Sequence, residues 1–281
     1  MPRRRLPSIP PLRQQLLVDK PQNATTIPLP TTMLQFIEFF AVISAAGFGI
    51  LLARGKQMDF VGVYTVAIAT ALGGGTLRDV LLDREVFWIS QPYYPILIFV
   101  LTILGMTAGK FLLDAELKKF LQIPDALGLG MFAIVGAGYA WESIEIPGMI
   151  IGSKMFVCTL FGVITGCFGG VIAEIICNEV PSLFRNTPLY ATCAFAGCWI
   201  YLLLSEVPEM AGAAPIIGAV FVVGLRLLAL RHKWTLPIAT PPSPKKSLGA
   251  KKKSAAKKKS SSKKKSAAKR KAAEKKRRAG G

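Results

Sequence analysis

Residues 69–79 read ATALGGGTLRD, and residues 164–174 read ITGCFGGVIAE. When the two stretches are aligned at an offset of 95 residues, a threonine, a pair of glycines and an acidic residue coincide. The coinciding positions are Thr70 with Thr165, Gly74 with Gly169, Gly75 with Gly170, and Asp79 with Glu174. This agreement predicts that the chain contains an internal repeat.

Seven apolar segments contain or flank these stretches. They cover approximately residues 34–52, 60–77, 95–113, 126–141, 149–176, 189–204 and 213–230. Most are close to the roughly 20 residues that an α-helix needs to cross the hydrocarbon core of a bilayer. The chain is 52% apolar with a mean hydropathy of +0.44, although its C-terminal part is almost entirely polar. We therefore expect an all-α integral membrane domain with seven transmembrane helices over residues 33–236.

A second correspondence completes the repeat. Glu38 and Asp125 are each expected to open an apolar helix, and each is followed eleven residues later by a glycine. The helices then form two repeats of three, about 34–113 and 125–204, followed by a seventh helix at about 213–230. Because an odd number of spans makes the second copy enter the membrane from the opposite side, the repeats are inverted. Inverted repeats are common in proteins that move solutes, with the site near the repeat interface.

The glycine clusters indicate where such a site lies. Each glycine inside a helix costs about 1 kcal/mol relative to alanine, so Gly73, Gly74 and Gly75 together are expected to kink or open their helix. Carbonyl groups freed in this way need a water-filled cavity or other polar groups, and they are suitable ligands for a cation. The alternative is close packing of helices through small residues. Two clusters at equivalent positions favour a pathway that Gly169 and Gly170 also line.

Charged residues near the glycines are candidates for the same pathway. Arg78 and Asp79 are expected to face the pore or to pair with each other, because an ionisable group in a membrane is costly unless it is paired or hydrated. Glu174 lacks a neighbouring arginine because Ala173 occupies that position, so it could attract a cation or extend to the interface. Lys154 lies inside the fifth segment and could line a cavity or reach the headgroups.

Both ends of the chain are expected to be disordered. Residues 1–32 are rich in proline and weakly basic. Residues 237–281 form a Lys-rich tail, in which Lys245 to Arg278 contain eighteen basic residues and one glutamate, or +17 of the net charge of +19. The tail is expected to be solvated and to contact anionic lipid headgroups. Nucleic acid is disfavoured as a partner because no aromatic or folded reader accompanies the basic run.

Basic residues also predict the orientation in the membrane. The side shared with the C-terminus carries Arg54, Lys56, Lys110, Lys118, Lys119, Arg185, Arg231 and Lys233. The opposite side carries Arg78, Arg84 and Lys154 but otherwise acidic residues. The positive-inside rule therefore places the C-terminus in the cytosol, although the weakly basic N-terminal extension opposes this orientation. The sequence leaves open whether the membrane is that of the cell or of an organelle.

The sequence does not favour an enzyme. Its single histidine, His232, lies near the tail, and its five cysteines lie in apolar segments without a CxxC spacing. Such thiols behave as small apolar residues. Because no Ser/His/Asp, Cys/His or metal-ligand arrangement is present, we expect no catalytic residues, no metal site and no cofactor.

The strings GGGTLRDVLL at residues 73–82 and DALGL at residues 125–129 resemble the prokaryotic-type trimeric intracellular cation channels, also known as tandem glycine-transporter-domain proteins. The resemblance covers the membrane domain and neither end. It implies seven helices, a homotrimer, a pore in each protomer, potassium or sodium permeation, and kinked second and fifth helices. Family members carry the full glycine and Arg-Asp pattern in both repeats, whereas this chain has Phe168, Ala173 and Glu174 in the second.

Three functions follow as hypotheses. The first is a passive channel for a monovalent cation, with potassium as the leading candidate, framed by the second and fifth helices. The second is a carrier for a small zwitterion, with glycine as the leading candidate. The third is a membrane scaffold whose basic tail recruits anionic lipid or nucleic acid.

Overall fold

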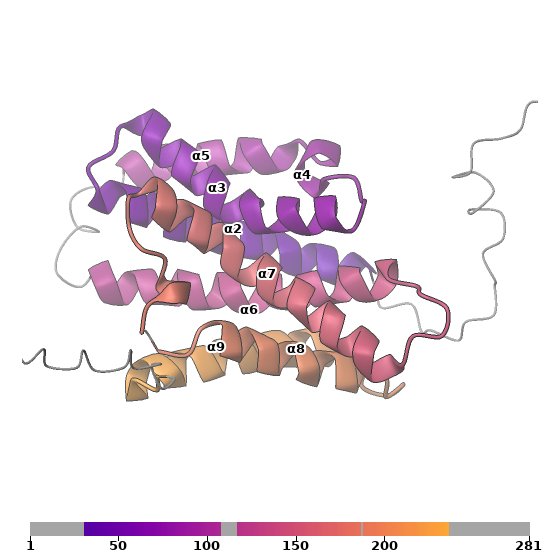
Figure 1. The fold of residues 1–281 in the computed structure, drawn as a ribbon. Helices are drawn as coiled ribbons and strands as arrows, with labels where there is room; N and C mark the ends of the chain where they lie inside the picture. Colours follow the sequence, from indigo (N-terminus) through magenta and orange to yellow (C-terminus); the bar gives the residue numbers. More distant parts are fainter. Residues whose placement is uncertain (1–30, 108–116, 187, 236–281) are drawn as a thin grey trace, which may run out of the picture. The chain divides into compact units, whose positions relative to one another are not determined.

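The computed structural model describes residues 31–107, 117–186 and 188–235, which form helices and their connections. The elements, shown in Figure 1, are α2 (Thr31–Gly55), α3 (Phe60–Leu81), α4 (Phe87–Ser90), α5 (Tyr93–Thr107), α6 (Leu117–Ser143), α7 (Ile151–Ile176), the 3-10 turn η2 (Ser182–Phe184), α8 (Ala191–Ser205) and α9 (Ala214–His232). The predicted Lys-rich tail, and the N-terminal extension up to residue 30, lie outside the described residues.

Each of the seven predicted apolar segments coincides with a helix over its described residues, while residues 108–113 of the third segment lie outside them. α2, α3, α6, α7 and α9 are long and apolar enough to cross a membrane. α5 and α8 are also apolar but contain 15 described residues each, and residues 108–116, directly after α5, lie outside the described part of the chain. At 1.5 Å per residue such a helix extends about 22 Å, which is shorter than the roughly 30 Å hydrocarbon core. The described residues thus contain five helices suited to a multi-pass membrane domain, while crossing by α5 and α8 stays a prediction.

α6 begins earlier than the sequence predicts. The prediction places Asp125 at the opening of a helix, but α6 begins at Leu117 and continues through Pro124 and Asp125. Proline is disfavoured inside a helix because it lacks an N–H and crowds the preceding turn. Here the Ser44 hydroxyl on α2 donates a 2.9 Å hydrogen bond to the carbonyl oxygen of Pro124. Asp125 therefore lies inside a long helix that α2 supports, rather than at the end of a shorter one.

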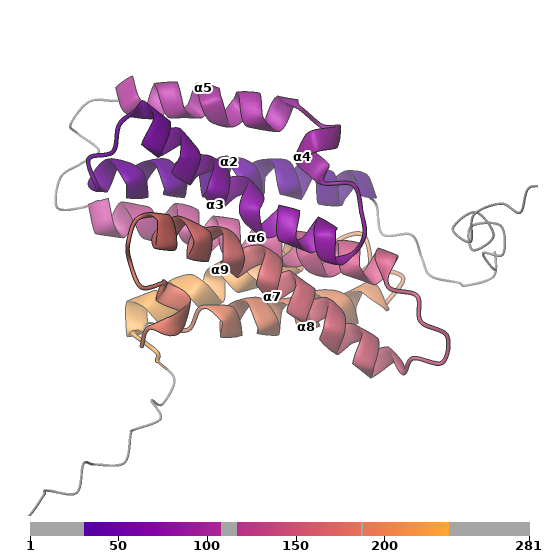
Figure 2. The ribbon, with the colours of Figure 1, turned by 45° about the horizontal axis from the view of Figure 1, so that its top comes forward.

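Four helices, α2, α3, α6 and α7, form the centre of the bundle. α6 packs against both α2 and α7, and α3 also packs against both α2 and α7. α5 lies against α2 and α3, whereas α8 and α9 lie against α6 and against each other. Figures 1 and 2 show α5 on one side of the four central helices and α8 with α9 on the other. The two halves of the membrane domain therefore meet through the α2–α6 and α3–α7 pairs.

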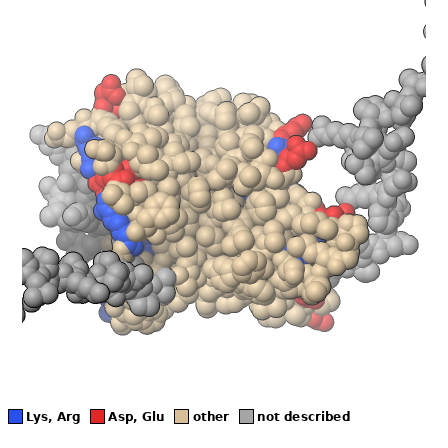
Figure 3. All heavy atoms as spheres, viewed as in Figure 1, with Lys and Arg blue, Asp and Glu red and all other residues tan. Residues whose placement is uncertain are grey.

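The interior is apolar, and so is most of the outer surface. One buried cluster includes Val66 and Ile98, and a second includes Ile134 and Val222. Figure 3 shows acidic and basic residues gathered at the two ends of the helices, with other residues between them. Large apolar side chains remain exposed along the outside; for example, Val61, Ile96 and Val220 are 67%, 63% and 65% exposed. A bilayer solvates such a surface, whereas a water-soluble protein rarely presents one.

Several basic residues gather at one end of the bundle. Lys56, after α2, lies 2.6 Å from Glu179, which follows α7, and Arg185 lies 3.6 Å from the same carboxylate. The N–H of Leu189 donates a 2.9 Å hydrogen bond to the carbonyl oxygen of Trp234 and so joins the start of α8 to the end of α9. This is the end that the sequence assigns to the cytosol, and that assignment stays a prediction.

Candidate functional site

α3 and α7 cross at their glycine clusters. Both helices are continuous through the glycines, so the expected break is not present in this structure. A methyl group at Gly74 would overlap the carbonyl oxygen of Thr165, and a methyl group at Gly169 would overlap that of Thr70. Glycine is needed at both positions because the two backbones touch. The alternative interpretation, close packing of helices through small residues, describes this crossing.

The contact of Gly74 with Thr165 and the contact of Gly169 with Thr70 are equivalent under the offset of 95 residues. Thr70 and Gly74 of α3 correspond to Thr165 and Gly169 of α7 at the offset of 95, and each glycine touches the threonine of the other helix. An exchange of the two helices would therefore reproduce the crossing. A local two-fold relation of this kind is what inverted repeats require at their interface.

The turns that follow α3 and α7 are also equivalent. Asp79 accepts a 3.0 Å hydrogen bond from the N–H of Phe87, and Glu174 accepts a 2.7 Å hydrogen bond from the N–H of Ser182. In both cases the acid lies eight residues before its donor. Glu174 also accepts a hydrogen bond from the Ser182 hydroxyl. It is therefore held by the turn after its own helix, although it has no adjacent arginine.

Arg78 fills the first-repeat side of the crossing. Its side chain is fully buried, and its guanidinium lies 2.9 Å from Glu38 and 2.8 Å from Asp79. The guanidinium also lies 4.6 Å from the ring centroid of Tyr139 and 5.6 Å from that of Phe87. The expected pairing of Arg78 with Asp79 is present. Glu38 on α2 completes a buried, charged cluster that leaves little room for a solute.

The two sides of the crossing differ in how tightly they are filled. A methyl group at Gly75 would meet the ring of Phe87 at 2.6 Å, whereas one at Gly170 would meet the Tyr190 hydroxyl at 3.6 Å, an ordinary contact. The large residues Arg78 and Phe87 of the first repeat correspond to Ala173 and Ser182 of the second. The first side is therefore closed by bulky groups, while smaller residues leave space on the second.

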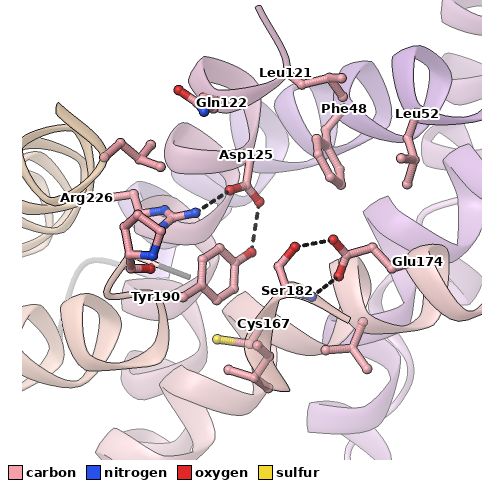
Figure 4. A pocket seen from close by; sticks show the side chains of 15 residues that line it. Phe48, Leu52, Leu121, Gln122, Asp125, Cys167, Glu174, Ser182, Tyr190 and Arg226 are labelled. Atoms are coloured by element: carbon pink, nitrogen blue, oxygen red, sulfur yellow. Dashed lines mark hydrogen bonds and ion pairs between the residues drawn. The ribbon is translucent and has the colours of Figure 1, made fainter. Parts of the chain in front are cut away.

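That space is a cavity of about 280 Å³ between α2, α6, α7 and α9, seen in Figure 4. Its polar lining consists of Gln122, Asp125, Glu174, Ser182, Tyr190 and Arg226. Phe48, Leu52 and Leu121 contribute apolar lining on the side of α2 and the start of α6. At about 30 Å³ per water molecule in the liquid, the cavity has room for several waters or a hydrated cation.

Asp125 is held in the cavity by two groups. The Tyr190 hydroxyl donates a 2.9 Å hydrogen bond to one carboxylate oxygen, and Nη2 of Arg226 lies 3.4 Å from the other. Figure 4 shows these three side chains grouped together, with Glu174 on the other side of the view and Ser182 between Tyr190 and Glu174. Two carboxylates and one guanidinium thus line this cavity.

A narrower space of about 20 Å³ continues the cavity toward the glycine crossing. It shares Phe48, Asp125, Gly170 and Tyr190 with the larger cavity. Its further lining includes Thr70 and Thr165, the two threonines that touch the glycines. A space of this size can hold a single water molecule. Together the two spaces therefore extend from the polar cavity to the threonines of the α3–α7 crossing.

The pathway residues predicted from the sequence fall in several places. Gly170 and Glu174 line the cavity. The others are Gly73, Gly74 and Gly169 at the helix crossing, Gly75 beneath Phe87, and Arg78 and Asp79 in the buried cluster. Lys154 lies near the start of α7 with its ammonium group 4.2 Å from the ring centroid of Trp141, away from this cavity.

The sequence interpretation misses four polar residues of the cavity: Gln122, Ser182, Tyr190 and Arg226. Arg226 lies inside the seventh apolar segment, and an arginine within a span is itself a signal of a paired or functional group. Ser182 could have been found by extending the offset of 95 beyond Glu174 into the following turn. Asp125 is recognised in the sequence as the equivalent of Glu38 and not as part of a site.

Relatives of known sequence match most of the membrane domain. The model of a family described as "Glycine transporter" matches residues 35–110 and 122–206. A UPF0126 membrane protein of Vibrio cholerae is 32% identical over 214 residues, which cover 74% of this chain and 84% of the relative. The UPF0126 inner membrane protein YadS of Escherichia coli K12 is 32% identical over 195 residues, covering 67% and 87%.

Solved structures of two TRIC (trimeric intracellular cation) channels share the fold. One, described as showing the structural basis for conductance through TRIC cation channels, has a TM-score of 0.63 at 29% identity and covers 75% of this chain and 98% of its own. The other is the orthologue from Rhodobacter sphaeroides, with a TM-score of 0.64 at 26% identity, covering 72% and 100%.

Proposed function

We propose that this chain, which belongs to the TRIC family of prokaryotic type, is a potassium channel that assembles as a homotrimer with a permeation pathway in each protomer. Its structural neighbours are cation channels, so the class of a non-enzymatic cation channel is supported directly. We further propose that the channel selects potassium and that three protomers assemble.

The observation that carries the proposal is the acidic cavity that reaches the α3–α7 crossing. Asp125 and Glu174 supply two carboxylates, and Arg226 supplies one positive charge. A cation therefore finds a favourable potential inside the membrane domain, where an unpaired charge would otherwise be costly. The narrow inner space leads the ion to Thr70 and Thr165, whose oxygen atoms can replace part of its hydration shell.

The proposed pathway is closed on its first-repeat side in this structure. Gly74 and Gly169 bring the helix backbones into contact, and Arg78 with Phe87 fills the space beyond. Conduction then requires α3 and α7 to move apart at the glycines, and Arg78 to leave its position between Glu38 and Asp79. A helix pair joined by backbone contact through glycine can slide or separate without repacking large side chains there.

The equivalent contacts of α3 and α7 support the arrangement of seven transmembrane helices as two inverted repeats. The paired turns after the two helices extend the relation beyond the glycines. In this arrangement α5 and α8 each complete a repeat and cross the bilayer as its third helix. Their 15 residues are sufficient where the bilayer thins locally or where flanking residues extend the span.

Purified protein in liposomes tests the channel. A potassium gradient should produce a flux that depends on voltage and does not saturate at physiological concentrations. Replacement of both cavity acids, in the Asp125→Asn/Glu174→Gln variant, should reduce the flux at least severalfold. Glu209→Gln, an exposed acid after α8, is the matched control and should leave the flux unchanged. Equal flux through the unchanged protein, the double variant and the control would show that the ion does not pass through the cavity.

A glycine carrier is the second candidate. The cavity places an arginine beside two carboxylates, so one site offers partners for both charges of a zwitterion. It is also open on one side of the repeat interface and closed on the other, as alternating access requires. Saturable glycine uptake with counterflow, in the absence of potassium conductance, would favour the carrier over the channel.

A further inference from the structure

The second repeat lacks the arginine that the first repeat uses. In the first repeat, Arg78 lies between Glu38 of the first helix and Asp79 of its own helix. In the second, Asp125 and Glu174 occupy the positions of these two acids, but Ala173 occupies that of the arginine. A guanidinium nevertheless lies 3.4 Å from Asp125, and it belongs to Arg226 of α9. α9 is the helix that neither repeat includes.

Arg226 is fixed in place by several contacts besides Asp125. Its Nη1 donates hydrogen bonds to the carbonyl oxygens of Pro188, at 2.8 Å, and of Leu189, at 2.9 Å. Its guanidinium lies 4.6 Å from the ring centroid of Tyr190, and the residue is only 5% exposed. The segment that precedes α8 therefore holds the charge at the wall of the cavity. The positive charge of Arg226 therefore contributes to the electrostatic potential inside the cavity.

We propose that Arg226 determines the charge selectivity of the cavity, as a counter-charge that α9 supplies in place of the arginine missing from the second repeat. The proposal rests on the proposed function, in which the cavity carries the permeating cation. With Asp125, Glu174 and Arg226 ionised, the cavity has a net charge of −1, and without Arg226 it has −2. Two carboxylates without a counter-charge favour a divalent cation, because Ca²⁺ and Mg²⁺ prefer carboxylate oxygens. Arg226 thus keeps the cavity suited to a monovalent ion.

A local probe of charge tests the proposal without any measurement of flux. Gln122 lines the cavity and is exposed, whereas the five native cysteines are buried. In a Gln122→Cys background in detergent, the rates of reaction with a cationic methanethiosulfonate (trimethylammonium-ethyl) and with an anionic one (sulfonato-ethyl) report the potential. A unit charge about 8 Å away changes each rate by somewhat more than about twofold in water, in opposite directions, so the ratio of the rates changes about fivefold.

Arg226→Gln should therefore raise the cation-to-anion rate ratio about fivefold, while Arg226→Lys should leave it near the original value. Arg231→Gln removes the same charge five residues later on α9, from an exposed position, and should leave the ratio unchanged. An Arg226→Gln ratio no higher than that of Arg231→Gln would overturn the proposal. If Arg226→Gln alone does not fold, the comparison of Asp125→Asn with Asp125→Asn/Arg226→Gln measures the same charge, and equal ratios would overturn the proposal equally.

Flux measurements then separate this inference from the proposed function. In liposomes, millimolar Ca²⁺ should inhibit potassium flux through Arg226→Gln at least severalfold more strongly than through the unchanged protein or Arg231→Gln. If Arg226→Gln conducts potassium and Ca²⁺ inhibits it no more than the unchanged protein, the proposed role of Arg226 is contradicted, but the proposed channel function is not. If the ratio of the two thiol-reagent rates changes as expected but the protein conducts no cation, Arg226 still sets the charge of the cavity, and the proposed channel function is contradicted.

Discussion

Gly74 of α3 lies directly against the carbonyl oxygen of Thr165 of α7, with no space for a methyl group between them. The same relation holds for Gly169 and Thr70, so the two helices are locked at two equivalent points. In a membrane, where apolar side chains gain little from leaving lipid, such close backbone approach is a main source of helix association. The crossing is therefore both the tightest contact on the proposed pathway and the place where it must open.

Replacement of Gly74 by alanine should destabilise the protein, because the added methyl group forces the backbones of α3 and α7 apart. Overpacking of this kind costs about 1–3 kcal/mol. Thermal unfolding in detergent, followed by the loss of monodisperse protein, measures the effect. The matched control is Gly47→Ala in α2, where a methyl group meets no atom within 4 Å. The control should be as stable as the unchanged protein or slightly more so, because alanine favours a helix by about 1 kcal/mol. Equal stability of the two variants would contradict the close contact.

Much of the fold is present in the sequence because membrane helices must be long and apolar. All seven apolar segments coincide with helices, and the offset of 95 that aligns Thr70 with Thr165 also aligns their contacts. The start of α6 could not be placed, because proline usually marks the first turn of a helix, whereas α6 begins seven residues before Pro124 and contacts α2 there through the Ser44 hydroxyl. A local pattern cannot contain a contact that is 80 residues distant in the chain.

The site is only partly readable for a related reason. The glycines mark the correct crossing, but their number and spacing do not distinguish an opened helix from two helices in contact. That distinction depends on the partner backbone, which for Gly74 is 91 positions away at Thr165. Arg226 lies outside both repeats, so the alignment of the repeats does not point to it. Its role follows only when α9 packs against α6 and brings the guanidinium to Asp125.

Replacement of Arg78 by glutamine should destabilise the protein strongly. Glu38 and Asp79 would lose their shared counter-charge, and removal of one partner from a buried ion pair typically costs about 3–5 kcal/mol. Arg185→Gln provides the control, because Arg185 is exposed and its 3.6 Å ion pair with Glu179 lies at the surface. Such surface pairs contribute about 0–1 kcal/mol. Thermal unfolding in detergent should show a large loss for Arg78→Gln and little change for Arg185→Gln. Similar losses in both variants would contradict the buried cluster.

Replacement of Phe87 by serine, the residue at the equivalent position 182, should open the first-repeat side of the crossing. The Phe87 ring covers Gly75 and lies 5.1 Å, centroid to centroid, from the ring of Tyr94. Its removal leaves a cavity, which for phenylalanine typically costs about 3–5 kcal/mol of stability. Potassium flux into liposomes should nevertheless rise severalfold per folded protein. Phe87→Leu keeps most of the volume and should conduct like the unchanged chain. A Phe87→Ser variant that folds and shows unaltered flux would place the barrier elsewhere.

Replacement of Gly170 by leucine should block the cavity without unfolding the protein. A methyl group at this position meets the Tyr190 hydroxyl at 3.6 Å, so alanine fits and a longer side chain projects into the 280 Å³ space. Potassium flux should fall at least tenfold for leucine and less than twofold for alanine, while thermal unfolding in detergent stays within a few degrees for both. Gly224→Leu in α9, where a methyl group meets no atom within 4 Å, is the control for a larger side chain in a helix. This variant should conduct potassium like the unchanged protein. Gly170 and Gly74 lie on facing helices, but only Gly74 is in backbone contact. Substitution of Gly74 should therefore lower stability, whereas substitution of Gly170 should lower flux. Loss of flux at Gly170 without loss of folding would mark the cavity as the route of the ion, whereas full conduction through Gly170→Leu would show that the ion does not pass through the cavity.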